Sequence, residues 1–309
     1  MTPAAARRLI YVDTSMWNHL YDQRVPVGEL SARLAELNAT LLIGDHAVNE
    51  LAKTFTSSRT GAGDRAAALC SYLREYVDSG IPIIKPNWAL LIEEALHIVG
   101  DAGPPEILLA ESHRDFLRAR LDELVSKTVS PEIRKELEGR VAASRDHTDS
   151  MKKVLGRETR LAEHLRNIEA GDLGTWIATE TTLRIGVQAL QINLQTQFPE
   201  NAPTDLWDVC RRLLDRPRYR VSRALVRTTL YSLWRCAKYG TVPKDFNDDT
   251  LHLTNASYCE FFATADPQHA RQRAEVFDTC RLILCAESND LLHWLPLKIA
   301  EFDSATKPL

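Results

Sequence analysis

Four acidic side chains stand at points of the sequence where chemistry is often placed in enzymes. Asp13 and Asp266 directly follow short apolar runs, Glu50 lies about one and a half turns into a helical pattern, and Asp249 opens another helical pattern. Carboxylates held close together repel one another and favour their protonated forms. A hard divalent cation with oxygen ligands, Mg²⁺ or Mn²⁺, removes this conflict. A shared metal site is therefore one interpretation of the four acids.

Each acid taken singly also has a structural interpretation. Asp13 can start a turn, Asp249 can cap the N-terminus of a helix, and Asp266 can cap the helix that follows it. Glu50 can be a solvated residue paired with Lys53. For any one residue the structural interpretation is favoured. The order in which the motifs occur favours the shared site. They are strand–D–[TS], helix–E–L, D–xx–H–xxx–A and strand–T–x–D.

The elements that must position these acids alternate between strands and helices. Apolar, β-prone runs predict short buried strands, and the segments between them carry apolar residues at helical spacing. This alternation predicts an α/β fold with a parallel sheet, at whose carboxyl edge the acids converge. The predicted strands are residues 9–12, 41–43, 81–84, 261–264 and 282–284.

The strand signal disappears in the middle of the chain. We therefore expect a first α/β part over residues 1–100, an all-helical insertion over 101–244 for substrate or partner recognition, and a second α/β part over 245–309. Within the insertion, residues 131–170 show a heptad-like seam. This stretch predicts either a protruding hairpin or partner surface about 60 Å long, or two ordinary amphipathic helices broken near Gly156.

The combined motifs resemble the PIN domain, a nuclease fold of many bacterial toxins and of RNA-processing factors. The resemblance covers about residues 5–100 and 245–290. The matching segments are IYVDTSMW, VNELAKTF, IPIIKPNWALLIEEA and NDDTLHLTNASYCEFFATAD. It implies a PIN-like parallel sheet flanked by helices, with the all-α insertion, and Mg²⁺- or Mn²⁺-dependent cleavage of phosphodiester bonds, usually in RNA.

The resemblance also implies roles for individual residues. Asp13, Glu50, Asp249 and Asp266 would take the metal-binding and catalytic roles. The groups that orient them or contact phosphate would be Thr14, Ser15, Thr264 and Asp248. The sequence departs from the family pattern at two places: Asp45 and His46 stand where a small hydroxyl residue is usual, and the pair Asp248-Asp249 leaves the third ligand ambiguous. The spacing to His252 and Ala256 favours Asp249.

A basic segment and two histidines are further candidates. Residues 211–227 hold seven Arg and one Asp, and four of the arginines fall on one helical face: Arg216, Arg220, Arg223 and Arg227. Arg binds phosphate well, so this face predicts a nucleic-acid contact, with Tyr219 and Trp234 stacking on bases; a solvated, ion-paired face is the alternative. His46 and His252 are interpreted first as structural histidines, and as metal or phosphate contacts second.

Composition narrows the class of protein. The chain has 309 residues, 44% hydrophobic and 26% charged, with a net charge of −4, which is typical of a globular protein and not of one that coats nucleic acid by bulk charge. No apolar run is long enough for a signal peptide or a membrane span, so we expect a cytoplasmic protein. The six cysteines lack zinc-site spacing and are expected to be reduced and buried. Phosphate-binding glycine loops and a GxSxG elbow are absent, and Ser15 stands where a haloacid-dehalogenase-type phosphatase needs a second Asp.

The sequence therefore predicts a metal-dependent endonuclease that prefers RNA, in the role of a toxin or defence effector. DNA is an alternative substrate. A different alternative is a catalytically inactive PIN-like scaffold that binds a protein partner through its helical insertion. An inhibitory or regulatory protein partner and a homo-oligomer are compatible with either function.

Overall fold

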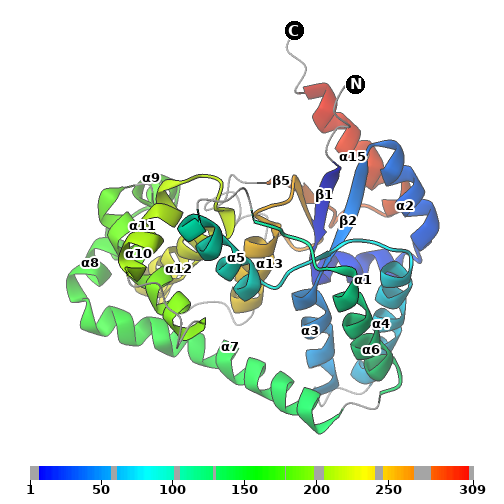
Figure 1. Cartoon of the computed structure of the whole chain (residues 1–309), viewed down its shortest axis with the longest axis horizontal. Coiled ribbons are helices and arrows are strands. Elements are labelled where there is room, and N and C mark those ends of the chain that lie inside the picture. Colours follow the sequence, from blue (N-terminus) through cyan, green and yellow to red (C-terminus); the bar gives the residue numbers. More distant parts are fainter. Residues whose placement is uncertain are drawn as a thin grey trace.

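A parallel β-sheet forms the centre of one half of the molecule (Figure 1). The computed structural model describes residues 7–56, 61–100, 105–127, 130–177, 179–197, 205–240, 246–267 and 280–305. Within these residues the sheet has five strands in the order β3-β2-β1-β4-β5, all parallel. The strands are β1 (Arg8–Val12), β2 (Ala39–Gly44), β3 (Ile83–Ile84), β4 (Phe261–Thr264) and β5 (Arg281–Leu284). The predicted α/β class and parallel sheet are confirmed.

The two faces of the sheet bury alternate residues of each strand, as the two-residue period of a strand requires. On β1, Ile10 and Val12 pack into one core and Tyr11 into another. On β4, Phe261 and Phe262 divide in the same way. Both faces are therefore covered by helices, which explains why the strands read as continuous apolar runs.

Helices before and after the strands form the layer on the first face. They are α1 (Thr14–Asp22), α2 (Val27–Glu36), α3 (Asp45–Lys53), α4 (Ala62–Asp78), α6 (Glu111–Val125) and α15 (Leu291–Ala305), with a 3₁₀ turn at Thr54–Thr56. Three buried leucines of α6 (Leu117, Leu121 and Leu124) join the core that Ile10 and Val12 build. Thus α6, which we assigned to the insertion, packs with the α/β part.

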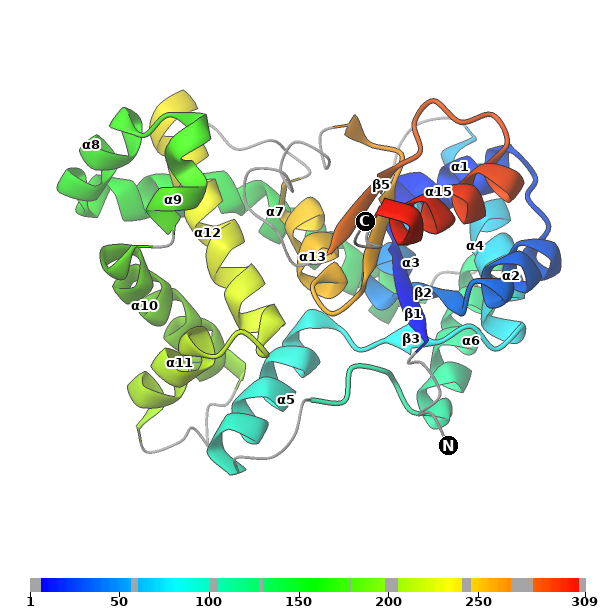
Figure 2. The same ribbon diagram turned by 90° about the horizontal axis from the view of Figure 1, so that it is seen from above.

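The other helices gather beyond the second face of the sheet, where α5 and α13 lie between the sheet and the outer helices (Figure 2). They are α5 (Asn87–Gly100), α8 (Thr159–Asn167), α9 (Leu173–Ile177), α10 (Glu180–Gln197), α11 (Leu206–Asp215), α12 (Arg220–Tyr239) and α13 (Phe246–Ala256), with a 3₁₀ turn at Ala170–Asp172. Tyr11, Leu42 and Phe262 share one buried core with Trp234 of α12. The helical part is therefore fused to the sheet through continuous packing.

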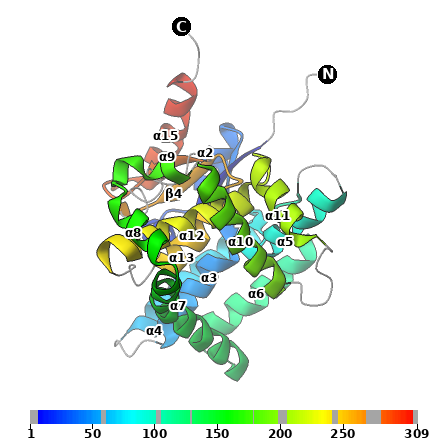
Figure 3. The ribbon, with the colours of Figure 1, turned by 90° about the vertical axis from the view of Figure 1, so that its left-hand side faces the viewer.

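The longest helix, α7 (Pro131–Arg157), runs along the lower edge of Figure 1 from the α/β part to the helical part and comes to the front of Figure 3. Ser130 caps its N-terminus by accepting a hydrogen bond from the N–H of Ile133, with Pro131 in the first turn. The helix ends at Arg157 and α8 starts two residues later. Of the two interpretations of residues 131–170, the one with two helices broken near Gly156 is confirmed.

Two further sequence expectations can be compared with the structure. All six cysteines are free and buried, as expected. In the part of the chain that the structure describes, no helix combines the length and apolar character that crossing a bilayer requires. The helical pattern expected over residues 268–278 lies outside the described residues.

Candidate metal site at the sheet edge

The carboxyl ends of β1 and β4 meet at the point where the strand order of the sheet reverses. The chain runs from β1 outward through β2 to β3, and from β4 outward to β5 on the other side. In open α/β sheets, ligands bind outside the strand ends at such a point. Asp13 follows β1 here and Asp266 follows β4, so the topology brings these two ends of the chain to one edge, as predicted.

Asp13 is almost fully buried and its carboxylate is occupied by neighbouring donors. Its side chain caps α1 by accepting a hydrogen bond from the N–H of Met16 at 2.8 Å. The hydroxyl of Ser15 donates to it at 2.8 Å and that of Thr264 at 2.6 Å. Asp13 therefore ties α1 to the end of β4, and the predicted orienting roles of Ser15 and Thr264 match the observed contacts.

The same two hydroxyls hold the loop after β4. Ser15 accepts a hydrogen bond from the N–H of Ala265 at 2.9 Å, and Thr264 accepts one from the N–H of Asp266 at 3.0 Å. The backbone of Asp266 is thus fixed beside the network around Asp13, and its side chain is half-buried. This explains the T–x–D motif physically, since the threonine links the strand end to the loop that carries the second acid.

A second cluster joins α3 to α13. His46 and Glu50 lie four residues apart on α3, which places them on one face of the helix. His252 of α13 contacts the Glu50 carboxylate through Nε2 at 2.8 Å. Potential ligand atoms of these three residues all lie within 4.8 Å of one another. Among the described residues this is the group of His, Cys, Asp and Glu side chains that meets the geometry of a metal site.

The four predicted acids are therefore divided. Glu50 belongs to the His46–Glu50–His252 cluster, while Asp13, Asp249 and Asp266 do not bring ligand atoms into it at that spacing. Asp249 is buried on α13, one turn before His252. The side chain of Asp248 lies outside the described residues. From the sequence, His46 and His252 were interpreted first as structural residues. The D–xx–H spacing and the position of His46 four residues before Glu50 were the signals that could have ranked them higher as metal ligands.

Surrounding groups hold the cluster in place. The hydroxyl of Thr14 donates a hydrogen bond to Glu50 and lies 3.3 Å from Nε2 of His252. The hydroxyl of Tyr11 contacts Nδ1 of His252 at 2.8 Å. Metal-binding histidines are typically oriented through the ring nitrogen that does not bind the metal. Tyr11 takes this position here, and Thr14 connects the cluster to the Asp13 network one residue away.

Gly44, at the end of β2, makes room for the Tyr11 side chain. A Cβ atom at this position would lie 2.6 Å from the Tyr11 hydroxyl oxygen and 2.9 Å from its Cε2 atom. Both distances are too short for a real contact. Glycine is therefore required at residue 44 by space, so that Tyr11 can reach His252.

The electrostatics of the cluster favour an ionised carboxylate. Burial raises the pKa of Glu50. The hydrogen bond to His252, the charges of His252 and His46, and the Thr14 hydroxyl together lower it by more than burial raises it, so that the pKa falls to about 2. Burial also keeps the pKa of Tyr11 well above its ordinary value of 10.0. At neutral pH the site thus presents one carboxylate, with a protonated Tyr11 hydroxyl behind His252.

The donor set fits a divalent cation. Two imidazoles and one carboxylate are ligands that Zn²⁺ and other transition metals accept, whereas Mg²⁺ prefers oxygen ligands alone. Mn²⁺ accepts carboxylate oxygen readily and also binds imidazole. His46 and His252 are both buried, with 6% and 2% of their surface exposed. The chemistry of the residues therefore suits Mn²⁺ better than Mg²⁺.

The predicted basic face has a different environment. Arg220 donates to the carbonyl of Ser257 at 3.4 Å, and Arg223 donates to the carbonyl of Leu214 at 2.7 Å. Arg216 and Arg227 are half-buried. Two of the four arginines thus hold backbone carbonyls of neighbouring segments.

The aromatic residues proposed to stack on bases beside that face are buried. Tyr219 is fully buried and Trp234 is 1% exposed. The prediction that these two rings stack on nucleic-acid bases is therefore wrong, because both rings complete the apolar core of the helical part.

Comparison of the chain with protein-family models, with curated proteins and with solved structures found no match. The geometry of the site itself is the basis for the functional conclusion.

Proposed function

We propose that the protein is a PIN-like, metal-dependent endonuclease that hydrolyses phosphodiester bonds, with RNA as the preferred substrate. The observation that carries this proposal is the approach of His46, Glu50 and His252 to within 4.8 Å at the carboxyl edge of a parallel sheet. The cation is Mn²⁺ or Mg²⁺, and the two imidazoles favour Mn²⁺. A cation bound there would lower the pKa of a bound water and stabilise charge on the scissile phosphate.

The residues of the chain take three kinds of role in this proposal. His46, Glu50 and His252 hold the cation, and Tyr11 and Thr14 keep His252 and Glu50 in position. Asp13 is a positioning residue here, because its carboxylate joins α1 to β4 and so sets the place of Thr14.

Asp249 and Asp266 remain proposed ligands or phosphate-side groups. Asp249 shares α13 with His252, and Asp266 follows Thr264, whose hydroxyl donates to Asp13. The role of Arg216, Arg220, Arg223 and Arg227 in binding nucleic acid remains a proposal too, as does that of Asp248. A cytoplasmic toxin or defence effector, held in check by a regulatory protein or by self-association, is the biological role that we propose by analogy with PIN nucleases.

The inactive scaffold is the competing function from another class. A scaffold has no need to bring metal-binding side chains together, whereas the cluster combines two buried histidines with an ionised glutamate. This convergence favours the enzyme. Contacts to phosphate carry no information on the sugar, so DNA is kept as the alternative substrate.

The test uses purified full-length protein and labelled single-stranded RNA and DNA, with Mn²⁺, with Mg²⁺ and with EDTA. We expect Mn²⁺-dependent cleavage of RNA that EDTA abolishes. The Glu50→Gln variant should lose both cleavage and at least about tenfold in Mn²⁺ affinity by calorimetry. Glu29→Gln, which alters an exposed glutamate of α2 paired with Arg33, serves as the matched control and should change neither.

Three outcomes would contradict the proposal. Glu50→Gln protein that cuts as well as the parent would exclude the site. Cleavage that persists in EDTA would exclude the metal mechanism. Mn²⁺ binding without cleavage of either nucleic acid would favour the scaffold. Asp13→Asn and Asp249→Asn measure, in the same assay, whether these acids take part in the reaction.

A further inference from the structure

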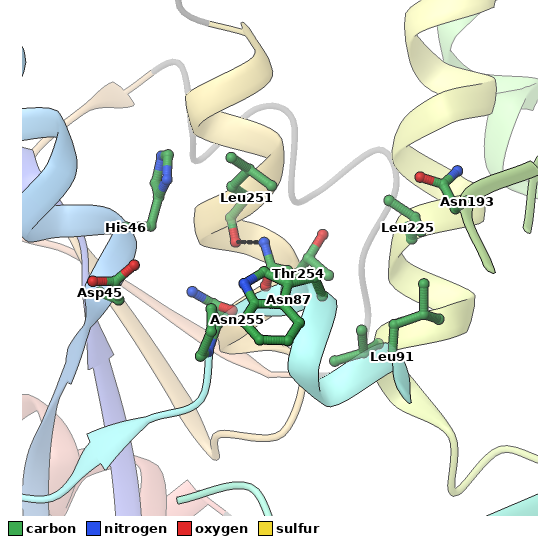
Figure 4. A pocket seen from close by; sticks show the side chains of 12 residues that line it. Asp45, His46, Asn87, Leu91, Asn193, Leu225, Leu251, Thr254 and Asn255 are labelled. Atoms are coloured by element: carbon green, nitrogen blue, oxygen red, sulfur yellow. Dashed lines mark hydrogen bonds between the residues drawn. The ribbon is translucent and has the colours of Figure 1, made fainter. Parts of the chain in front are cut away.

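A cavity of about 220 Å³ lies between the α/β part and the helical part, directly beside the metal cluster. Asp45 and His46 of α3 line one side of it, and Asn193 and Leu225 line the opposite side (Figure 4). His46 belongs to both the cavity and the metal cluster. A group bound in the cavity is therefore next to the proposed scissile phosphate.

The asparagine and threonine side chains of this cavity each already donate one hydrogen bond within the protein. The amide nitrogen of Asn87 donates to the carbonyl of Leu251 at 3.1 Å, and that of Asn255 donates to the hydroxyl of Tyr11 at 3.5 Å. The hydroxyl of Thr254 donates to the carbonyl of Thr250 at 2.7 Å. Asn193, at the far side, donates to the carbonyl of Ala189 in the same way.

Two acceptor atoms of the lining have no partner in the described part of the chain. The side-chain oxygens of Asn87 and Asn255 are buried and have no hydrogen-bond partner among the described residues. Asn255 is fully buried. Asp45 adds a carboxylate to the lining, with one oxygen accepting from Asn49 at 2.8 Å. Buried polar atoms in folded proteins normally have partners, so this cavity is built to receive a ligand that supplies several N–H donors.

The remaining lining is apolar and partly aromatic. Leu91, Val221 and Leu225 face the cavity from α5 and α12, and Trp88 stands at it with 56% of its surface exposed. The volume of the cavity equals that of about seven water molecules at roughly 30 Å³ each. This volume suits one flat ring system, and it is smaller than the roughly 300–1,000 Å³ of pockets for larger ligands. The Asp45 carboxylate disfavours an anion, so phosphate itself does not belong in this cavity.

We propose that the cavity binds one unpaired nucleobase of the substrate, with guanine preferred, and so selects the phosphodiester bond that is cut; the substrate part of this inference rests on the proposed nuclease function. Guanine presents N1–H and its N2 amino group side by side, two adjacent donors for the acceptor lining. Adenine and cytosine present one amino group beside a ring acceptor. Uracil presents one N–H between two carbonyls, whose oxygens would be repelled by the acceptor atoms of the cavity.

Direct binding tests this without any cleavage. Calorimetric titration of the intact, metal-free protein with guanosine, adenosine, cytidine and uridine should give guanosine the highest affinity, at least about tenfold above uridine (about 1.4 kcal/mol). Asn87→Ala and Trp88→Ala should each lower guanosine affinity about tenfold. The matched controls are Asn167→Ala, an exposed residue of α8, and Trp207→Ala, a half-exposed residue of α11; both should bind guanosine as the parent does.

Cleavage separates this inference from the function on which it rests. With labelled RNA of mixed sequence, we expect cuts next to guanosine in the parent and loss of that preference in Trp88→Ala, with Mn²⁺ affinity unchanged. Guanosine binding without cleavage would retain the cavity assignment and reject the nuclease. Glu50-dependent cleavage without base preference, together with equal affinity for all four nucleosides or with no binding, would reject the cavity assignment and retain the nuclease.

Discussion

Glu94 joins α5 to the start of α12, and its removal should have a large effect on stability. The side chain is fully buried on α5 and its carboxylate accepts hydrogen bonds at 2.8 Å from the N–H groups of Val221 and Ser222. The hydroxyls of Ser222 and Tyr258 donate to it as well, each at 2.5 Å. Both N–H groups lie in the first turn of α12, whose own N-cap, Tyr219, makes no side-chain cap. Glu94 therefore caps α12 from another helix.

The size of the effect follows from the donors left behind. Glu94→Ala leaves two buried backbone N–H groups without an acceptor, at about 1–3 kcal/mol each, while the two hydroxyls can rotate to other acceptors. Together these two groups cost about 2–6 kcal/mol, and the substitution also removes the cost of burying a charge, so we expect a net loss of about 2–4 kcal/mol. A domain is stable by about 5–15 kcal/mol. Glu94→Gln keeps one oxygen acceptor and should lose about half as much.

The measurement is urea unfolding followed by circular dichroism. Glu93→Ala is the matched control, because Glu93 is the partly exposed neighbour that pairs with Lys85 at 2.9 Å; its loss should be about 1 kcal/mol or less. A loss at residue 94 no larger than at residue 93 would refute the proposed cap of α12.

The pH dependence of the same variants gives an independent check. Burial raises the pKa of Glu94, and the hydrogen bonds offset this only in part. A raised pKa means that the folded protein binds this proton more tightly than the unfolded chain does. The contribution to stability is therefore complete below the ordinary pKa of 4.5 and declines as the pH rises through the folded pKa. We expect the stability of the parent relative to Glu94→Gln to fall as the pH rises above 4.5; a rise would contradict this reasoning.

Two further predictions concern the site. Gly44→Ala places a Cβ 2.6 Å from the Tyr11 hydroxyl, so Mn²⁺ affinity should fall about 10–100-fold as Tyr11 moves away from its position behind the cluster. The control is Gly28→Ala, whose Cβ would meet nothing within 4 Å and which should leave the Mn²⁺ affinity unchanged. Equal Mn²⁺ affinities of the two variants would disprove the positioning role of Tyr11. Asp13→Asn should cost about 2–3 kcal/mol in thermal or urea unfolding, because a buried cap with several donors is lost. Asp205 is the more exposed cap of α11 and accepts a hydrogen bond from the N–H of Asp208 at 3.0 Å. Asp205→Asn should therefore cost less than about 1 kcal/mol, and similar losses for the two variants would contradict the role given to burial.

The helical part illustrates where sequence patterns were sufficient and where they were not. The end of α7 near Gly156 could be anticipated because glycine and a change in apolar period mark helix ends. The position of α6 could not, since its leucines fit any apolar surface and only packing decides which core they enter. The same holds for Arg220 and Arg223, whose helical spacing is visible in the sequence, while their carbonyl partners lie directly after α13 and on α11.

The sequence by itself determined the strands, the parallel sheet and the edge at which Asp13 and Asp266 lie, because apolar periodicity and chain order are local properties. It also singled out Glu50. Only the tertiary structure decided that Glu50 faces His46 and His252, while Asp13 caps α1 and binds Ser15 and Thr264. A side chain selects its partners by direction and by the space around it, and both depend on how α3, α13 and the tip of β1 pack together.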